Sequence, residues 1–543
     1  MIRSAVLKLQ DLRKNTDWKL LIFLILFLNV KSVVKIIAIA LIYIIQFDFK
    51  FGFRNSVPRL PLFYVFIIVV AIFNWLITKS FMSTSSNIAL LTGISIWLLC
   101  ILVIHQLKLF VDNTDTTSIY QTIIIFFLIN ALLSFINFAG IVWETGALNP
   151  YRYQGEYQKY FIRTGDYIKG ITFDTSTANS IISAFGVIFF LVKRNWIMLL
   201  ICMLILLATA SNIINMLMIG IFGFMFFYRS NANQKSFVII CLMMGIVFMV
   251  KVSPENYKYV KEAIQKMADK KTVITPASTS AKIPITEIED NLLTPEERKH
   301  KIAQLYLDSI YKSRLKSAKG KEYISAEIVK PKIEVPDINT APFQSKIDTT
   351  LQQRKLLMFM NAHKKSLPLS EKEDRNLILP GKIIAFKQTF DYLHSHPEKI
   401  LTGDGMGNFS SRLAFRTTGL GISGNYPTKY ASISPGFLSN HLDIYLYYFS
   451  KRIYFHSLIN SPNSVYNQLL SEYGIIGISI FAVFYFGFFW KHYRKLTYGI
   501  PLLLLMGGVF FIDYWFEQLS VVILFELLLL LNIKEAELNK LHI

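Results

Sequence analysis

The chain has 543 residues, of which 53% are hydrophobic and 17% are charged. A soluble domain carries roughly a quarter charged residues, so this composition excludes an ordinary soluble enzyme and predicts an all-α polytopic membrane protein. The formal net charge is +21. Cytoplasmic loops of membrane proteins collect Lys and Arg for topological reasons, and a basic outer loop suits anionic lipid substrates, so we expect no nucleic-acid partner.

Twelve apolar runs follow one another along the chain and predict about twelve transmembrane helices, since a span needs about 20 mostly apolar residues. Nine lie in a predicted N-terminal bundle (1–250) and three in a C-terminal part (464–543). The first two are short, so they can also form one interrupted helix across Lys31–Lys35. The runs are Lys19–Val30, Val33–Phe47, Leu60–Thr78, Ile88–Ile104, Tyr120–Trp143, Ala178–Val192, Trp196–Ala210, Ile213–Phe227, Phe237–Val250, Gly474–Phe489, Ile500–Trp515 and Leu519–Leu531.

Basic residues in the loops predict the orientation of these spans. With twelve spans, five basic clusters fall on one side, so we expect both termini to be cytoplasmic. The connection 144–176 and a large polar loop, residues 251–463 between the ninth and tenth helices, then lie outside. The clusters are Arg3–Lys19, Lys50–Arg59, Lys193–Arg194, Arg229–Lys235 and Lys491–Lys495.

The smaller outer loop, residues 144–176, is rich in tyrosine and basic residues, including Arg163 and Lys169. Such side chains gather at membrane interfaces because they are amphipathic. Aromatic rings that stack on sugars and cations that bind a diphosphate would give the same composition. Both interpretations stay open on the sequence.

The large outer loop changes in character at Pro380. Residues 251–379 are polar and rich in turns, with one predicted helix from Thr294 to about Lys316, and we interpret them as a variable insert. Residues 380–463 are the part in which we expect the active site. They open with a helical pattern over Lys382–Leu393, which carries Lys382 and Lys387.

A glycine-rich turn follows this predicted helix. Gly403, Gly405 and Gly407 alternate along it, and Arg412 and Arg416 come directly after. Glycine turns beside arginines can hold a phosphate through backbone N–H groups. The same spacing also occurs in plain turns, so a structural role is the alternative.

Three passages resemble the O-antigen ligase and O-antigen polymerase superfamily, bacterial membrane glycosyltransferases that use polyprenyl-diphosphate sugars. They are Asp166–Asn179 at the entrance of a span, Gly381–Phe409, and Asn463–Gly477 where the chain re-enters the membrane. In that family the last passage reads roughly His-Asn-x-Tyr-Leu-x-x-Leu-x-Glu-x-Gly-Ile-x-Gly. The resemblance covers most of residues 166–489 apart from the insert.

The resemblance implies a GT-C-like fold in the bacterial inner membrane, with the large loop periplasmic and mainly helical. It implies metal-independent, cofactor-free transfer of a glycan from a polyprenyl-diphosphate donor to a hydroxyl group of a glycan, lipid A core or protein acceptor. The loop also shows no Asp-x-Asp motif and no clustered His and Cys, so we expect no metal. Lys169 and Lys382 stand where the family commonly has arginines. The candidate diphosphate-binding residues are Arg163, Lys169, Lys382, Lys387, Arg412 and Arg416.

One departure from the family concerns the chemistry. The histidine thought to activate the acceptor is Asn463 here, and asparagine cannot act as a base near neutral pH, although it can orient a hydroxyl group. His441, His456 and Glu472 are the other catalytic candidates, with His456 slightly favoured because it precedes the motif by seven residues. Each has a structural alternative, the histidines as polar loop residues and Glu472 as a cap or ion-pair partner at the membrane edge.

Other function classes stay open. A transferase can polymerise repeat units, ligate a finished chain to lipid A core or glycosylate protein. A flippase for lipid-linked oligosaccharides also suits twelve spans, but transporters tend to carry charged residues inside their spans, and here Glu526 is the clearest such residue. A third class is a non-enzymatic scaffold whose outer loop binds cell-wall glycan.

Overall fold

The structure is a computed structural model of the chain. It describes residues 15–28, 32–45, 51, 59–152, 164–173, 175–228, 230–253, 301, 305, 358–359, 361–365, 367, 380–421, 424–444, 458 and 461–541. The chain divides into two compact units, residues 1–153, 162–267 and 348–543 in one, and 154–161 and 268–347 in the other. In the second unit the structure describes Lys301 and Leu305, and both are helical. They belong to the helix expected at Thr294–Lys316, whose other residues lie outside the described ones.

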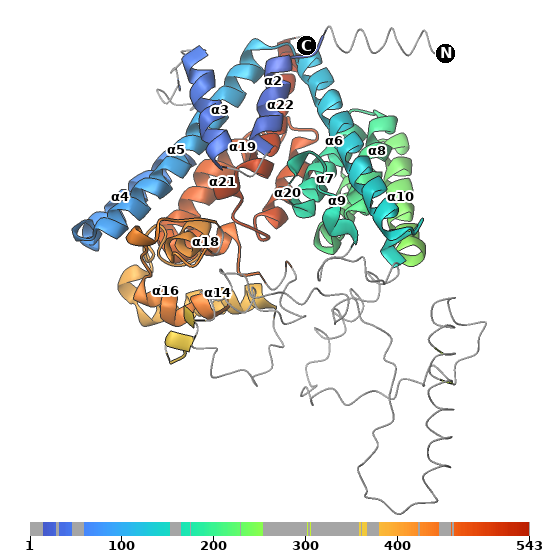
Figure 1. Cartoon of the computed structure of the whole chain (residues 1–543). Helices are drawn as coiled ribbons and strands as arrows, with labels where there is room; N and C mark the ends of the chain where they lie inside the picture. The colour runs from blue at the N-terminus through green and yellow to red at the C-terminus, as the bar shows by residue number, and fades with distance from the viewer. Residues whose placement is uncertain are drawn as a thin grey trace, which may run out of the picture. The chain divides into compact units, whose positions relative to one another are not determined.

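The described part of the N-terminal region consists of helices joined by turns (Figure 1). No strand occurs among the residues that the structure describes. The long helices of this region are α2 (Trp18–Leu28), α3 (Ser32–Ile45), α4 (Phe63–Ile77), α5 (Thr84–Asn113), α6 (Thr116–Thr145), α7 (Ser176–Val192), α8 (Trp196–Ala208), α9 (Asn212–Phe227) and α10 (Ala232–Val247).

The C-terminal region contains helices of two kinds. The polar part holds α14 (Gly381–Ser395), α15 (Arg412–Thr417) and α16 (Pro435–Asn440). Helix α14 confirms the helix predicted over Lys382–Leu393. The apolar helices are α18 (Val465–Ile480), which continues through the π-helix η11 (Phe481–Phe486) into α19 (Gly487–Trp490), then α20 (Gly499–Val509), the short α21 (Trp515–Gln518) and α22 (Ser520–Leu541).

Each of the twelve predicted apolar runs overlaps one of these helices. Among the residues that the structure describes, four helical segments are long and apolar enough to cross a membrane: α5, α6, Ala232–Val252 and Val465–Trp490. The same described part holds seven shorter apolar helices of 10–17 residues. The structure thus confirms a helical protein with membrane-spanning character, while the number of spans and their orientation stay predictions.

Lys35, which lies both in the connection Lys31–Lys35 and in the predicted run Val33–Phe47, is part of α3, where it is 2% exposed and its Nζ donates to the backbone oxygen of Gln518. One predicted boundary is wrong. The run Ile500–Trp515 is not one helix, because α20 ends at Val509. The Phe510 carbonyl accepts the N–H of Val465 at 2.9 Å, and the chain then turns before α21 begins. Asp513, which the sequence places inside a span, therefore lies in this turn.

Side-chain caps fix the start of several helices in the N-terminal region. Asp115 accepts the N–H of Thr117 at 3.0 Å before α6, and Thr175 accepts that of Ala178 at 3.2 Å before α7. Asn231 forms a capping box before α10. Each cap satisfies an N–H group that has no partner within its own helix, which defines where the helix begins.

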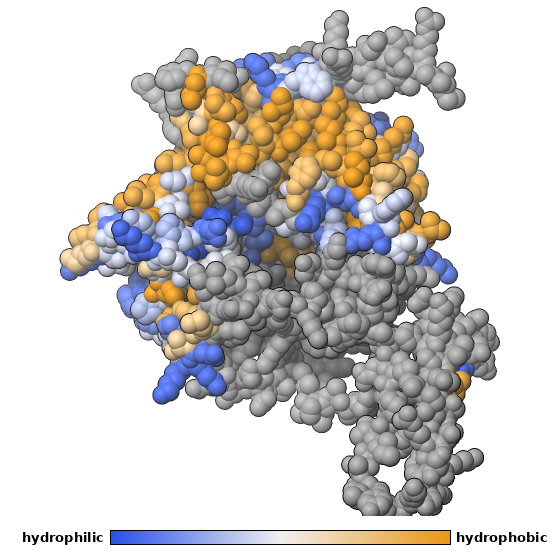
Figure 2. Space-filling view, in the orientation of Figure 1, coloured by the Kyte–Doolittle hydropathy of each residue, from blue (hydrophilic) through white to orange (hydrophobic). Residues whose placement is uncertain are grey.

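Helix α22 lies in the centre of the hydrophobic core, and residues 520–531 of this helix are buried without exception. It packs against α2, α5, α7 and α20. Figure 2 shows a hydrophobic band across the helical part, with hydrophilic side chains below it. In Figure 1, the polar helices α14 and α16 lie below the apolar helices α18 and α21.

Candidate functional site

Lys382 is buried at the start of α14, with 1% of the residue exposed. Its Nζ donates to the backbone oxygens of Asn463 and Ile512, the latter at 2.8 Å, and lies 5.9 Å from the centre of the Phe511 ring. Burial lowers the pKa of Lys382 to about 7, and the negative charge of Asp513 opposes this shift. A lysine ammonium has three protons, and the described residues offer acceptors for two.

Asn463, which stands at the position of the family's histidine, connects this cation to a carboxylate. Its backbone oxygen is one of the two that Lys382 binds, and its Nδ2 donates to Oδ1 of Asp513 at 3.2 Å. The same carboxylate oxygen accepts the N–H of Tyr514 at 2.7 Å. The asparagine therefore lies between a positive and a negative group that belong to two other segments of the chain.

A second series of hydrogen bonds, made by buried side chains, lies next to the bonds of Lys382, Asn463 and Asp513. The hydroxyl groups of Tyr514 and Ser410 lie 2.9 Å apart, and Oγ of Ser410 accepts Nδ2 of Asn467 at 3.0 Å. All three residues are buried, Tyr514 with 1% and the other two with 0% exposed. These bonds join α18, the turn before α21 and the segment that follows the glycine-rich turn.

Glu517 on α21 brings the arginines of α15 into the same region. Its two oxygens accept Nε2 of Gln468 at 2.7 Å and the N–H of Leu413 at 3.0 Å. Burial raises the pKa of Glu517 to about 7, and the charges of Arg416 and Arg412 oppose this rise. Both predicted diphosphate-binding arginines therefore interact electrostatically with a carboxylate of the turn between α20 and α22.

The glycine-rich turn is bound to α18 rather than open to a ligand. The N–H groups of Gly407 and Phe409 donate to the Glu472 carboxylate at 2.8 and 3.2 Å. The N–H of Gly405 donates to the backbone oxygen of Glu472 at 3.1 Å. These groups have protein acceptors, so we do not assign the turn to phosphate binding. The geometry favours the structural interpretation of Glu472.

Helix α18 is interrupted where it meets this turn. Gly474 has φ 65° and ψ −160°, a conformation outside the helical region. The N–H groups of Ile475 and Ile476 donate to the carbonyl oxygens of Ile400 and Leu401 at 3.0 and 3.1 Å instead of within the helix. A Cβ atom at Gly474 would collide with the Leu401 carbonyl group. Only glycine fits here, for both reasons.

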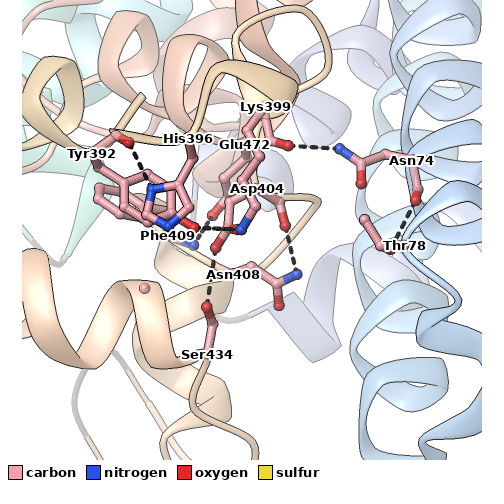
Figure 3. Close-up of polar contacts among 12 residues, drawn as sticks. Asn74, Thr78, Tyr392, His396, Lys399, Asp404, Asn408, Phe409, Ser434 and Glu472 are labelled. Carbon is pink, nitrogen blue, oxygen red and sulfur yellow. Dashed lines mark hydrogen bonds and ion pairs between the residues drawn. The ribbon is translucent and has the colours of Figure 1, made fainter. Parts of the chain in front are cut away.

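Asp404 fixes the glycine-rich turn to the rest of the polar part (Figure 3). Its carboxylate accepts hydrogen bonds from Tyr392 at 2.7 Å and from Ser434 at 3.0 Å, and it forms an ion pair with Lys399. Asp404 is 7% exposed, so its carboxylate has lost most of its contact with water. The ion pair with Lys399 compensates for this loss. This cluster joins α14, the turn and the segment before α16.

Helix α4 holds the turn from another side. Asn74 on this helix is 2% exposed, and its Nδ2 donates to the backbone oxygens of Thr402 and Gly403 at 2.7 and 3.0 Å. Figure 3 shows this side chain directed at the turn. Helix α4 binds carbonyl groups of this turn, and α18 binds its N–H groups. The turn is therefore part of the scaffold that positions α15.

His441, a predicted catalytic candidate, is enclosed by aromatic rings. It is 0% exposed, and its ring centre lies 5.0 Å from that of Phe409 and 6.1 Å from those of Phe415 and Phe437. Burial lowers the pKa of His441 to about 3. Neither ring nitrogen has a hydrogen-bond partner in the described part of the chain. This environment suits a core side chain rather than a base, and His456 lies outside the described residues.

The predicted diphosphate-binding residues do not all converge in the described contacts. Lys169 precedes the 3-10 turn η4 (Gly170–Thr172), which packs on α6 and α7. Oδ1 of Asn137 accepts the N–H groups of Lys169 and Gly170, each at 3.0 Å. Lys387 is exposed on α14, unlike the buried Lys382. Arg163 lies outside the described residues.

Sequence reasoning missed Asp513, Glu517 and Asn467. Asp513 was included in a predicted apolar run, although two carboxylates four positions apart, Asp513 and Glu517, interrupt the segment Phe511–Leu519. Acidic residues within membrane-spanning regions are costly and mark functional positions, so this interruption was a usable signal.

Comparison of the chain with protein-family models, with curated proteins and with solved structures gave no match.

Proposed function

We propose that this protein is a membrane glycosyltransferase that moves a glycan from a polyprenyl diphosphate to a hydroxyl group of an acceptor. The observation that carries the proposal is the contact between Lys382 and Asn463, beside Asp513. Two passages of the family resemblance meet at this contact, where Lys382 of one lies beside Asn463 of the other, at the position of the family's histidine, and the turn after α20 adds the carboxylate of Asp513.

Positive charge is the first requirement of this chemistry, because a diphosphate leaves readily only when its negative charge is offset. Lys382 supplies a charge in a site shielded from water, where electrostatic interactions are stronger than in water. An arriving diphosphate raises the pKa of Lys382, since an anion favours the protonated amine. Arg412 and Arg416 supply further charge from α15.

Proton transfer is the second requirement, and Asn463 cannot meet it. We assign the proton acceptor to Asp513, whose carboxylate is hydrogen-bonded to Asn463 at 3.2 Å. In the proposed step the acceptor oxygen forms a bond to the anomeric carbon and the bond from that carbon to the diphosphate oxygen breaks. The diphosphate leaves with the electron pair, and the hydroxyl proton moves to Asp513.

The proposed location is the bacterial inner membrane, with both termini cytoplasmic and the large loop periplasmic. Among the transferases we favour a polymerase, because the motif histidine is missing and the loop carries a long insert. Ligation to lipid A core and protein glycosylation are the alternatives. A gel of surface glycans from cells lacking the protein separates them: single repeat units replace a ladder for a polymerase, and full-length chains accumulate on the lipid carrier for a ligase.

Transport of lipid-linked oligosaccharide is the proposal from another class. Lys35 and Glu526 are buried charges in the helical bundle, as transporters tend to have. However, Lys35 donates to Gln518, and Glu526 accepts hydrogen bonds from Tyr64 and Tyr485, the latter at 3.1 Å. Because the bundle supplies partners for both charges, we favour the transferase.

Purified protein in nanodiscs, given lipid-linked saccharide extracted from the source cells, tests the transferase directly. We expect release of polyprenyl diphosphate together with a lengthened acceptor, detected by mass spectrometry. Lys382→Met should abolish the product, whereas Lys429→Met, at an exposed lysine of the turn Thr428–Tyr430, should not. Wild-type protein that forms no product, or equal products from both variants, would overturn the proposal.

A further inference from the structure

Three carboxamide side chains at and just before the start of α18 share one state. The amide groups of Asn463, Asn467 and Gln468 donate to Asp513, Ser410 and Glu517, respectively. The amide oxygen of each is buried and accepts no hydrogen bond from any residue that the structure describes. Asn467 and Gln468 are 0% and 1% exposed.

This state is costly in a folded protein. An unpaired buried acceptor loses its hydrogen bonds to water without replacement, and most buried polar side-chain atoms have a partner. Three such acceptors within six residues, beside the proposed proton acceptor, therefore offer positions for hydrogen-bond donors from outside the chain, either water or a ligand. Amide donors of the same side chains are already used, so the amides cannot turn around without losing bonds to Asp513 and Glu517.

The missing partner must donate hydrogen bonds and carry no negative charge at these contacts. Amide oxygens repel carboxylate and phosphate oxygens, which are acceptors, and they bind hydroxyl groups well. A neutral, hydroxyl-rich sugar satisfies both conditions.

Asn467 supports a ligand role on separate grounds. In the sequence pattern to which Asn463–Gly477 is similar, this position is leucine, which makes no hydrogen bond. The pattern's histidine position, four residues earlier, is Asn463. Two departures from one pattern thus place unpaired amide oxygens in the same short segment, beside the proposed proton acceptor.

We propose that Asn463, Asn467 and Gln468 form a carboxamide subsite that binds the hydroxyl groups of a neutral sugar ring in the acceptor saccharide. This inference rests on the proposed function, because it takes the sugar to be the acceptor of the transfer. Lys382 lies on the other side of Asn463 and faces the donor diphosphate. The anionic diphosphate of the donor and the neutral sugar of the acceptor therefore bind on opposite sides of Asn463. The subsite selects acceptors whose terminal sugar is neutral over those that end in an acidic sugar.

Asn467→Leu is the sharpest variant, because leucine has similar volume and is the residue of the pattern. Gln106→Leu is the matched control: Gln106 on α5 is 0% exposed, and both its amide atoms lack partners among the described residues. Loss of one ordinary hydrogen bond to the acceptor should raise its KM about tenfold in Asn467→Leu. The KM for the donor and the activity of Gln106→Leu should not change.

Binding is measured separately from transfer. The glycan released by mild acid from the lipid-linked saccharide of the source cells is titrated into protein in nanodiscs, and the same glycan after O-methylation serves as a probe without hydroxyl donors. We expect the wild type to bind the native glycan, to reject the methylated one, and to bind more tightly than Asn467→Leu.

Each outcome decides between the two proposals. Equal glycan affinity and equal acceptor KM in the wild type and Asn467→Leu would overturn the subsite and assign the unpaired oxygens to buried water, even with transfer intact. Glycan binding that weakens in Asn467→Leu, in a protein that catalyses no transfer, would support the subsite and refute the transferase.

Discussion

At the scale of single residues, the site depends on how burial alters Lys382. A lysine in water stays protonated far above neutral pH, but Lys382 has a pKa of about 7 because it is buried. Its charge therefore varies across the physiological range, and a bound anion stabilises the charged form. On the proposed function, Lys382 is thus neutral in part of the free protein and becomes cationic when the diphosphate binds.

This predicts a pH dependence of donor capture. The free protein loses the Lys382 charge as pH rises through about 7, so kcat/KM for the donor should fall above this pH. The corresponding fall in kcat should occur at higher pH, because the bound diphosphate raises the pKa of Lys382. Initial rates over a pH series measure both. In Lys382→Arg the guanidinium stays charged, and the fall in kcat/KM should disappear; an unchanged profile in this variant would contradict the assignment.

Asp513 carries a prediction of its own. Asp513→Asn keeps the size of the side chain and removes the proton acceptor, so kcat should fall by about 10²–10⁴, the usual contribution of general base catalysis. The KM for the donor should stay close to that of the wild type. Single-turnover transfer measured alongside donor binding separates these effects. A large loss of donor binding with an unchanged chemical step would mean that Asp513 acts on Lys382 instead.

Asn463→His restores the residue of the family pattern beside the same carboxylate. An imidazole N–H can donate to Asp513 as the amide of Asn463 does, and its other nitrogen can accept a proton. We expect this variant to keep its activity or gain some, with the rate rising through the pKa of the new histidine. Correctly inserted protein without activity would show that the local geometry differs from that of the family.

At the scale of elements, apolar runs were predicted well because burial in lipid demands continuous hydrophobic sequence. The predicted Lys382–Leu393 helix also formed, since its pattern is local. The break at Gly474 was not foreseeable, because it depends on carbonyl oxygens of Ile400 and Leu401, some 70 residues away. The same holds for Glu472, whose role as an acceptor for the glycine-rich turn follows from a tertiary contact.

The break itself is testable. Gly474→Ala forces a Cβ atom onto the Leu401 carbonyl group at a positive φ, so the free energy of unfolding should fall by at least about 1–2 kcal/mol. Gly487→Ala in α19 is the control, since its Cβ atom would make only ordinary contact, 3.4 Å from the oxygen of Ala482. Thermal unfolding in detergent should show a lower Tm for the first variant only. Equal Tm values would mean that the segment around Gly474 can rearrange.

At the scale of the whole molecule, the predicted orientation determines on which side the proposed site opens. The three cysteines are buried, so added cysteines can be labelled with little background. We expect a membrane-impermeant maleimide to label Lys429→Cys in intact spheroplasts and Lys491→Cys only after the membrane is opened. Both lysines are exposed, which makes them matched positions. The reverse pattern would place the site in the cytoplasm and exclude a periplasmic transferase.

The shortness of α20 has a consequence for side reactions. Its 11 residues extend about 16 Å, roughly half of a 30 Å hydrocarbon core, so α20 cannot cross such a core by itself, and the acidic turn follows it directly. Charged groups in this turn need water or a substrate around them, and on the proposed function water is itself a competing nucleophile. The rate at which donor is hydrolysed when no acceptor is present should therefore report how completely the arriving saccharide excludes water from the turn.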